Sequence, residues 1–341
     1  MSVTIKDIAA AAGVSVSTVS RVMTSSQSVD QEKKERVMKA VRELNYVPNN
    51  NARNLRKTQS QTVLVLAKSI ENPFFRKIIQ NLSKILQFRG LSLEIRSVAY
   101  SDDEIAVAAR EAKNGNPCGI VLMGGSFGYS DDDFRTIGVP CVLVSIKAHQ
   151  RVNPDFYSSV IIDDKAEMKK ATEYLVELGH RRIGCIYSKG EDEVTPNTLR
   201  AEGYVQALEE HGIAFDPQLL CSPFQGAQSG YEFAFDAMMR LIERNPDMTA
   251  VVAVSDVLAI GAAKAIVASG RRIPEDISVI GFDGTDEAEY YNPSLDTVAQ
   301  PVEQFAQKVG EALLQMLTMK KTSHTVLDCN LINRGSCRIN N

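Results

Sequence analysis

The 341-residue sequence has no tryptophan, has only four histidines, and lacks several patterns that mark enzymes and membrane proteins. No apolar run approaches the ~20 residues that a membrane-spanning helix needs. There is no P-loop and no Gly-x-Ser-x-Gly nucleophile elbow, and residues 124–128 lack the glycine spacing of a dinucleotide-binding loop. We therefore expect a soluble protein that is not an enzyme and that uses no cofactor.

Cysteine and targeting patterns are also missing. The six cysteines are scattered without a Cys-x-x-Cys pair or a histidine at ligand spacing. This predicts reduced structural thiols and no metal site. Lys6 and Asp7 interrupt the first apolar stretch, which is unlike a signal peptide. We expect a cytoplasmic protein with no membrane association.

Charge is distributed unevenly along the chain. Residues 1–60 contain ten Lys/Arg and five Asp/Glu, whereas the whole chain has a net charge of −4, which leaves −9 on residues 61–341. A basic N-terminal region on an acidic body is consistent with a polyanionic partner for that region.

The N-terminal region has the pattern of a helix-turn-helix. A short alanine-rich helix, capped by Thr4, is followed by Gly13 and by a second helix that Ser15 can cap. Val19, Val22 and Met23 share one face of the second helix and should pack on the first. The opposite face is polar and can enter a DNA major groove, where arginine pairs with guanine. A third helix is expected from about Gln31 to Asn45, with Val37, Ala40, Val41 and Leu44 on its apolar face.

The next segment, residues 48–61, is rich in asparagine and begins with Pro48. It is either a flexible linker or a short helix that forms only on a partner surface.

Several motifs in these two regions resemble the lactose/galactose repressor (LacI/GalR) family. They are Val3-Thr-Ile-Lys-Asp-Ile-Ala9, Gly13-Val-Ser15, Thr18-Val-Ser-Arg21-Val22, Leu44-Asn-Tyr-Val-Pro-Asn49 and Ala52-Arg53-x-Leu55-Arg56. The resemblance implies a homodimer that reads a palindromic operator in double-stranded DNA. It also implies a hinge helix whose leucine wedges into the minor groove. The DNA-binding residues that follow from this resemblance and from the polar face are Thr4, Ser15, Val16, Ser17, Thr18, Ser20, Arg21, Asn49, Ala52, Arg53, Leu55 and Arg56.

From Thr62 onward, near-continuous apolar strands alternate with amphipathic helices, and the pattern occurs twice. This predicts an α/β fold of two doubly wound parallel sheets. It resembles the type I periplasmic-binding-protein body, which the repressor family shares. The expected domains are a head at 1–47, a hinge at 48–61 and a body at 62–341. Within the body, lobe 1 should comprise about 62–160 and 297–322, and lobe 2 about 161–296 and 323–341.

Ligands of such folds bind at the carboxyl ends of the strands. The loops there, with the family pattern, give a predicted effector site: Phe74, Phe75, Tyr100, Met123, Ser145, Arg200, Phe224, Ser255, Asp283 and Gln300. Asp283 and Arg200 match positions that bind effector in the family, although a structural salt bridge is the alternative. Ser255 and Gln300 could instead have a structural role, as a helix cap or as part of the cleft lining. One of the two phenylalanines should face the core. Charged groups facing aromatic rings suit a polyhydroxylated ligand, which we expect to be a carbohydrate.

Together these features predict a dimeric transcription regulator, most simply a repressor, whose operator affinity is set by a small molecule bound between two lobes. The sequence leaves open a cytosolic small-molecule sensor that acts through a partner protein. An enzyme with a fused head is disfavoured by the missing catalytic motifs.

Overall fold

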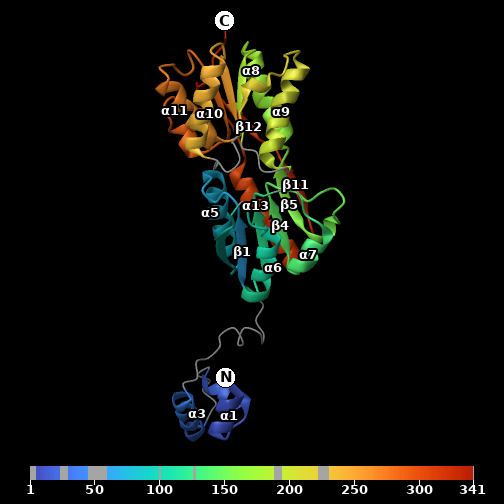
Figure 1. The fold of residues 1–341 in the computed structure, drawn as a ribbon. Coiled ribbons are helices and arrows are strands. Elements are labelled where there is room, and N and C mark those ends of the chain that lie inside the picture. The colour runs from blue at the N-terminus through green and yellow to red at the C-terminus, as the bar shows by residue number, and fades with distance from the viewer. Residues whose placement is uncertain are drawn as a thin grey trace. The chain divides into compact units, whose positions relative to one another are not determined.

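The computed structural model describes residues 5–23, 30–44, 60–99, 101–125, 128–187, 194–221 and 230–340. The chain divides into two compact units, Met1–Gln59 and Ser60–Asn341. Figure 1 shows the elements of each unit.

The described part of the first unit contains three helices, α1 (Ile5–Ala12), α2 (Val16–Met23) and α3 (Gln31–Glu43). The turn before α2 is as predicted: Gly13 has φ 60°, and the Ser15 hydroxyl accepts a hydrogen bond from the Thr18 amide at 3.2 Å. A small apolar core joins the helices and confirms the predicted packing of α2 on α1 for Val19 and Val22, while the Met23 side chain lies outside the described part. The buried members of this core are Ile8, Ala9, Ala12, Val19, Val22, Val37 and Ala40.

The third helix differs slightly from the prediction. It ends at Glu43, and Leu44, which we expected on the apolar face, is 37% exposed. The helix stops before the turn that would carry Leu44 inward, so the core of this unit rests on Val37 and Ala40 of α3, with Val41 partly buried.

The second unit contains two sheets, as the repeated pattern predicted, and each has six strands within the described residues. The first sheet has the order β11-β5-β4-β3-β1-β2, and its strand pairs are all parallel. Its strands are β1 (Thr62–Ala67), β2 (Ser92–Ser97), β3 (Gly119–Met123), β4 (Cys141–Val144), β5 (Ser158–Ile162) and β11 (His324–Leu327). The accompanying helices are α5 (Pro73–Gln87), α6 (Glu104–Gly115), α7 (Asp131–Ile137) and α13 (Val302–Met319), with a 3-10 turn at Pro154–Phe156.

The second sheet has the order β12-β10-β9-β8-β6-β7, and only β12 within it is antiparallel to its neighbour. Its strands are β6 (Ile183–Ile186), β7 (Leu220–Cys221), β8 (Ala250–Ala253), β9 (Ser278–Asp283), β10 (Asp296–Ala299) and β12 (Asn330–Ile332). The helices are α8 (Asp164–Glu177), α9 (Pro196–Glu210), α10 (Tyr231–Arg244), α11 (Asp256–Ala268) and α12 (Asp286–Glu289), with a 3-10 turn at Pro217–Leu219.

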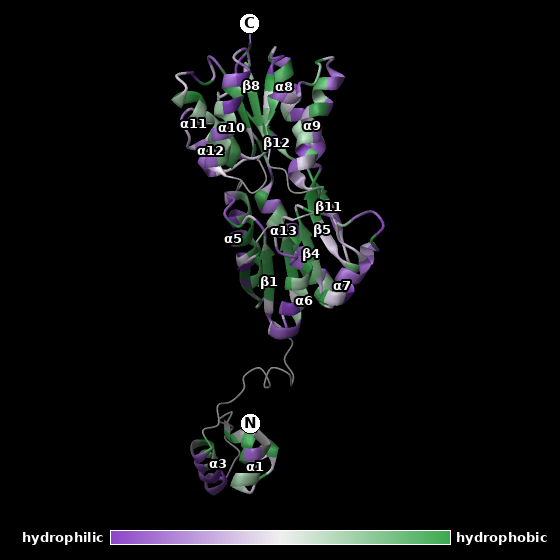
Figure 2. Cartoon of the chain, viewed as in Figure 1, coloured by the Kyte–Doolittle hydropathy of each residue, from purple (hydrophilic) through white to green (hydrophobic). Residues whose placement is uncertain are grey.

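The central strands are buried on both faces and the helices turn polar faces outward (Figure 2). This is the distribution expected of parallel sheets covered by helices. All six cysteines are free thiols, and Cys141 and Cys185 are buried in strands, as the scattered spacing predicted.

The sheets place two lobe crossings later than we expected. β10 belongs to the second sheet, so the chain returns to lobe 1 after Ala299 rather than at 297. β11 pairs with β5 in the first sheet, so the segment from 323 to 327 is part of lobe 1, not lobe 2. The first shift arises because β10 pairs with β9 along Asp296–Ala299, and the Asp296 carboxylate also accepts the Arg334 and Gly335 amides of the C-terminal segment at 2.8 Å each. The second was missed because β11 is a short edge strand with little buried apolar surface.

Close helix packing in lobe 2 depends on Gly261 of α11. A Cβ there would collide with the Tyr231 carbonyl oxygen and lie 2.7 Å from the Ala234 Cβ of α10. Since backbone cannot move aside as a flexible side chain can, the two helices need a glycine at this contact.

Replacing Gly261 with alanine should therefore destabilise the body. We expect Gly261→Ala to lower the free energy of unfolding by about 1–3 kcal/mol, the usual range for overpacking. Gly115→Ala is the matched control, because a Cβ at Gly115 meets its nearest atom at 4.0 Å. Urea denaturation followed by circular dichroism measures both. Equal stability of the two variants would contradict this assignment of the helix contact.

Candidate functional site

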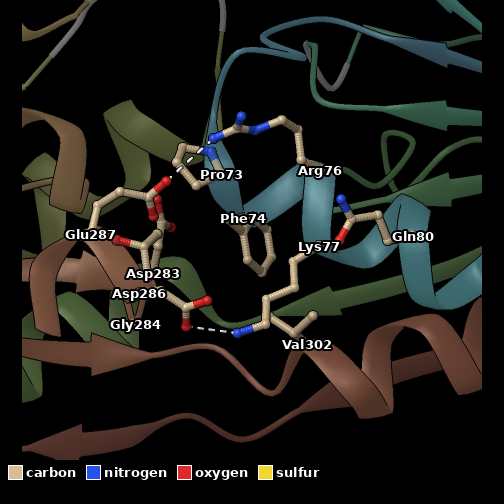
Figure 3. Close-up of a pocket in the computed structure, with 11 residues that line it drawn as sticks. Pro73, Phe74, Arg76, Lys77, Gln80, Asp283, Gly284, Asp286, Glu287 and Val302 are labelled. Atoms are coloured by element: carbon tan, nitrogen blue, oxygen red, sulfur yellow. Dashed lines mark hydrogen bonds and ion pairs between the residues drawn. The ribbon is translucent and has the colours of Figure 1, made fainter. Parts of the chain in front are cut away.

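A pocket of about 180 Å³ lies between the start of α5 in lobe 1 and the β9–α12 segment of lobe 2 (Figure 3). Its walls are therefore formed where strand and helix ends from both lobes meet. The lining residues are Pro73, Phe74, Arg76, Lys77, Gln80, Asp283, Gly284, Thr285, Asp286, Glu287 and Val302.

Asp283, the last residue of β9, is the buried polar group of this pocket. Its side chain is 2% exposed, and its φ of 119° lies in a region that L-residues rarely adopt. The carboxylate accepts hydrogen bonds from Gln300 Nε2 at 2.8 Å, Asn72 Nδ2 at 3.1 Å and Arg200 Nη1 at 3.5 Å. Burial raises the pKa of Asp283, and the Arg200 charge opposes that rise. The backbone turn at Asp283 thus directs its carboxylate into the pocket. The negative charge of this carboxylate is only partly balanced by Arg200.

Arg200 of α9 lies behind Asp283 and is largely committed to protein acceptors. Its Nε donates to Asp164 Oδ1 at 2.8 Å and its Nη1 to the Val254 carbonyl at 2.7 Å. The guanidinium also lies 3.8 Å from the ring centroid of Phe282. Burial raises the pKa of Asp164 to about 6, although Arg200 lowers it. The guanidinium therefore organises two carboxylates, Asp164 and Asp283.

Asp256, at the start of α11, is a third buried carboxyl near this group. It accepts the Thr285 amide at 2.6 Å and the Thr297 hydroxyl at 2.7 Å. Burial, followed by the charge of Asp283, raises the pKa of Asp256 to about 7. These contacts fix the loop that follows β9 and hold Asp283 in place.

Three polar contacts join the two lobes across the pocket (Figure 3 draws the two ion pairs). The buried one is the Asn72–Asp283 hydrogen bond. The others are Lys77 Nζ–Asp286 at 2.8 Å and Arg76 Nη2–Glu287 at 3.3 Å, whose side chains are about half exposed. Because α5 supplies one partner of every contact, any change in the angle between the lobes must alter all three.

The predicted effector residues fall into different environments. Phe74 lines the pocket but is itself only 3% exposed, and it meets Phe305 edge-on at 5.6 Å in the core that also contains Phe75. Met123 is also buried in the core. Ser255 caps α11 by accepting the Leu258 amide at 3.3 Å, which is the alternative we allowed for it. Tyr100 and Phe224 lie outside the described residues.

Ser145 and Gln300 are buried and have a polar atom left over. Neither Ser145 Oγ nor Gln300 Oε1 has a hydrogen-bond partner in the part of the body that the structure describes. Both residues follow strands, β4 and β10, at the strand ends where ligands of this kind of fold bind.

The sequence reasoning missed two residues that hold the site together. Asn72 is visible in the sequence as a helix cap before Pro73, and it does cap α5 by accepting the Phe74 amide at 2.9 Å. Its Nδ2 crosses to the other lobe, which no local signal reveals. Asp164 follows Asp163 at the start of α8 and looks in the sequence like a second helix-capping carboxylate. Asp163 accepts the Ala166 amide, whereas Asp164 accepts a hydrogen bond from Arg200.

Of the predicted DNA-binding residues, the structure describes the side chains of three. Ser15 and Val16 are exposed at the start of α2, and Thr18 is partly exposed beside them. Ser17, Ser20 and Arg21 lie on described backbone, but their side chains are outside the described part. Thr4, Asn49, Ala52, Arg53, Leu55 and Arg56 lie outside the described residues altogether.

Among the described residues, no group of three or more His, Cys, Asp or Glu side chains could hold a metal ion. No helix within the described ranges is long and apolar enough to cross a membrane.

These features define a class: a helix-turn-helix unit joined to a two-lobed body of the periplasmic-binding type. Comparison with known families agrees. Residues 4–49 match the family of bacterial regulatory proteins of the lacI type, and residues 172–337 match the periplasmic binding protein-like domain.

Similar proteins cover almost the whole chain. The HTH-type transcriptional regulator MalR of Clostridium butyricum is 36% identical over 98% of both chains. The HTH-type transcriptional repressor CytR of Escherichia coli K12 is 34% identical over 98% of this chain and 96% of its own. Among solved structures, the transcriptional regulator CelR in complex with cellobiose is 30% identical, covers 98% of this chain and 99% of its own, and has a TM-score of 0.70. The chain therefore belongs to the LacI family and is a DNA-binding transcription regulator.

The contacts of Arg200 with the buried carboxyls predict that the loss of stability on removing Arg200 depends on pH. Because the pKa of Asp164 is raised from 3.8 to about 6, its ionisation costs native stability as pH rises through that interval. Arg200→Ala should cost about 3–5 kcal/mol of unfolding free energy at pH 8, where the carboxylates lose their cation. At pH 5 the loss should be smaller, because protonated carboxyls need no cation.

Arg272→Ala is the matched control. Arg272 forms a pair with Asp276 at 3.2 Å, but its side chain is 69% exposed. Its removal should change the free energy of unfolding little, because solvent competes for both partners of the pair. The pKa of Asp276 is lowered, so this cost should not grow between pH 5 and pH 8. Chemical denaturation at both pH values measures the difference, and a pH-independent loss for Arg200→Ala would contradict our account of the buried group.

Proposed function

We propose that the protein is a cytoplasmic, homodimeric repressor whose affinity for a palindromic operator is set by a small molecule in the interlobe pocket. The observation that carries this proposal is that the pocket is built from both lobes, with Arg76 and Lys77 on one side and Asp283, Asp286 and Glu287 on the other. A ligand that contacts both sides binds one interlobe angle better than another. Such a difference in affinity is what shifts a conformational equilibrium.

A carbohydrate is the effector class that the relatives favour. CelR was solved with cellobiose, and a LacI-family regulator from Enterococcus faecium, 25% identical over 82% of this chain with a TM-score of 0.70, was solved with ribose. The pocket of this chain has an aromatic wall in Phe74 and a carboxylate in Asp283. Aromatic faces stack on sugar C–H groups and carboxylates accept sugar hydroxyls.

Each proposed domain has its own role in DNA binding and its regulation. The head at residues 1–47 reads the major groove through α2, and a hinge at 48–61 orders on DNA when two copies meet. Leu55 would wedge into the minor groove, and Asn49, Ala52, Arg53 and Arg56 would lie along it. In this scheme the interlobe angle sets the spacing of the two hinges in the dimer. A coupling free energy of about 1–3 kcal/mol between effector and operator is sufficient for regulation.

The experiment is an operator-binding titration of the full chain with and without cellobiose, ribose and related sugars. An operator is first selected from random duplexes. We expect one sugar to change operator affinity by about 5- to 150-fold, the range of typical allosteric coupling. Tight operator binding that no small molecule changes would favour control through a partner protein instead.

Alanine substitutions of the two arginines assigned to DNA binding should affect that binding in different ways. Arg21→Ala should lose preference at one operator position, by about 1–3 kcal/mol, because a bidentate contact to guanine specifies a base. Arg56→Ala should weaken operator and random DNA alike and reduce the slope of log affinity against log salt by about one. Fluorescence anisotropy on both duplexes at several salt concentrations separates them. An equal loss on operator and random DNA for Arg21→Ala would refute its role in base reading.

A further inference from the structure

The described chain crosses between the two lobes at three places, and each crossing brings a polar residue to the same buried group. β5 leads into α8 at Asp164, β10 leads into α13 through Gln300, and β11 leads into β12 through Cys329. Gln300 Nε2 donates to Asp283 Oδ1 at 2.8 Å. Burial raises the pKa of Cys329 to about 12, and the charges of Arg200 and Asp164 also act on it. The segments that must bend when the lobes move therefore meet at one cluster of buried charges.

Arg200 is the cation that the carboxylates of this cluster share. Its Nε donates to Asp164 Oδ1 at 2.8 Å, whereas its Nη1 donates to the Val254 carbonyl at 2.7 Å and lies 3.5 Å from Asp283 Oδ1. The side chains of Arg200 and Asp164 are 6% and 4% exposed, so water screens their contact little. Because Asp164 is the first residue of α8, this ion pair fixes the β5–α8 crossing to α9 of lobe 2.

The other described charges near Asp164 are acidic or are already paired with a carboxylate. They are Asp163, Glu167, Asp283 and the pairs Lys170–Glu167 at 2.8 Å and Lys165–Glu202 at 3.5 Å. Burial raises the pKa of Asp164 to about 6, and the charge of Arg200 opposes that rise. An arrangement of the lobes that takes the guanidinium farther from Asp164 therefore binds the proton more tightly.

We infer that Asp164 makes the angle between the lobes sensitive to pH. Its ionised carboxylate holds the β5–α8 crossing against Arg200 in the described arrangement, and protonation breaks this ion pair and lets the lobes part. The sign follows from linkage, because the arrangement that binds the proton less tightly is favoured as the pH rises. The contacts between the lobes should therefore persist at pH 7 and be lost in part at pH 5.

Fluorescence of a single tryptophan tests this response of the lobes. The chain has no tryptophan, so Tyr231→Trp gives one unambiguous signal. Tyr231 is the first residue of α10, is 46% exposed and lies near the Arg76–Glu287 pair that joins the lobes. We expect the emission to shift to longer wavelength as the pH falls from 7 to 5, with a midpoint near the Asp164 pKa of about 6, because parting of the lobes exposes the indole. Adding Asp164→Asn should abolish this transition, since an amide does not titrate.

Asp163→Asn is the matched control in the same tryptophan background. Asp163 is exposed, and its carboxylate accepts the Ala166 amide at 3.1 Å, so this variant should keep the transition. Thermal unfolding confirms that each variant folds, and Asp164→Ser, which is also uncharged, replaces Asp164→Asn if that variant does not fold. A chain that shows no transition with Asp164 in place, or a transition retained without the Asp164 carboxyl, would overturn the inference.

Operator affinity reports whether the DNA-binding head follows the lobes, and this step rests on the proposed function. All four histidines lie in residues 61–341, so the head has no side chain whose ordinary pKa falls between 5 and 7. We expect operator affinity of the full chain to change by about three- to tenfold between pH 7 and pH 5, which corresponds to a pKa difference of about half a unit to one unit between the two arrangements. Asp164→Asn should reduce that change. A fluorescence transition with constant operator affinity would support the response of the lobes and contradict the proposed coupling to DNA.

Discussion

The burial of the Asp283 carboxylate is the constraint on which the interlobe pocket depends. Its donors come from three distant parts of the chain: Asn72 at the start of α5, Arg200 on α9 and Gln300 after β10. A charge with 2% exposure is tolerated only when such donors are in place. Since the donors belong to both lobes and to a crossing segment, satisfying this carboxylate also sets the positions of these elements relative to one another.

The other polar contacts between the lobes contribute less free energy. The Lys77–Asp286 and Arg76–Glu287 pairs have side chains that are 42–63% exposed, so solvent competes for both partners. Exposed pairs of this kind contribute about 0–1 kcal/mol each. Among the described residues around the pocket, the lobes are therefore joined by two weak ion pairs and by the buried Asn72–Asp283 hydrogen bond. A ligand that competes for the donors of Asp283 acts on the stronger of these connections.

Much of this arrangement could be predicted from the sequence, because its signals are local. The apolar strands, the helix after Gly13 and the capping Ser15 follow from periodicity and side-chain chemistry. Asp283 and Arg200 were found through resemblance to a family and lie together in the structure. Asn72 and Asp164 were not found, because each looks like an ordinary helix cap and its second contact depends on how distant elements pack. β11 was missed for a related reason: an edge strand carries little apolar signal, and only its pairing with β5 defines it.

The buried acidic group conflicts with what stability alone would favour. Asp164, Asp256 and Asp283 are each at most 4% exposed, and burial raises the pKa of all three, whereas Arg200 supplies one buried cation among them. Apolar residues of similar size would avoid this cost. Places where a fold departs from its own stability rules are commonly places of function. Here the departure fixes hydrogen-bond acceptors before any ligand arrives. Under the proposed function, a ligand with matching donors would meet acceptors that are already in place, which lowers the free-energy cost of ordering the site on binding.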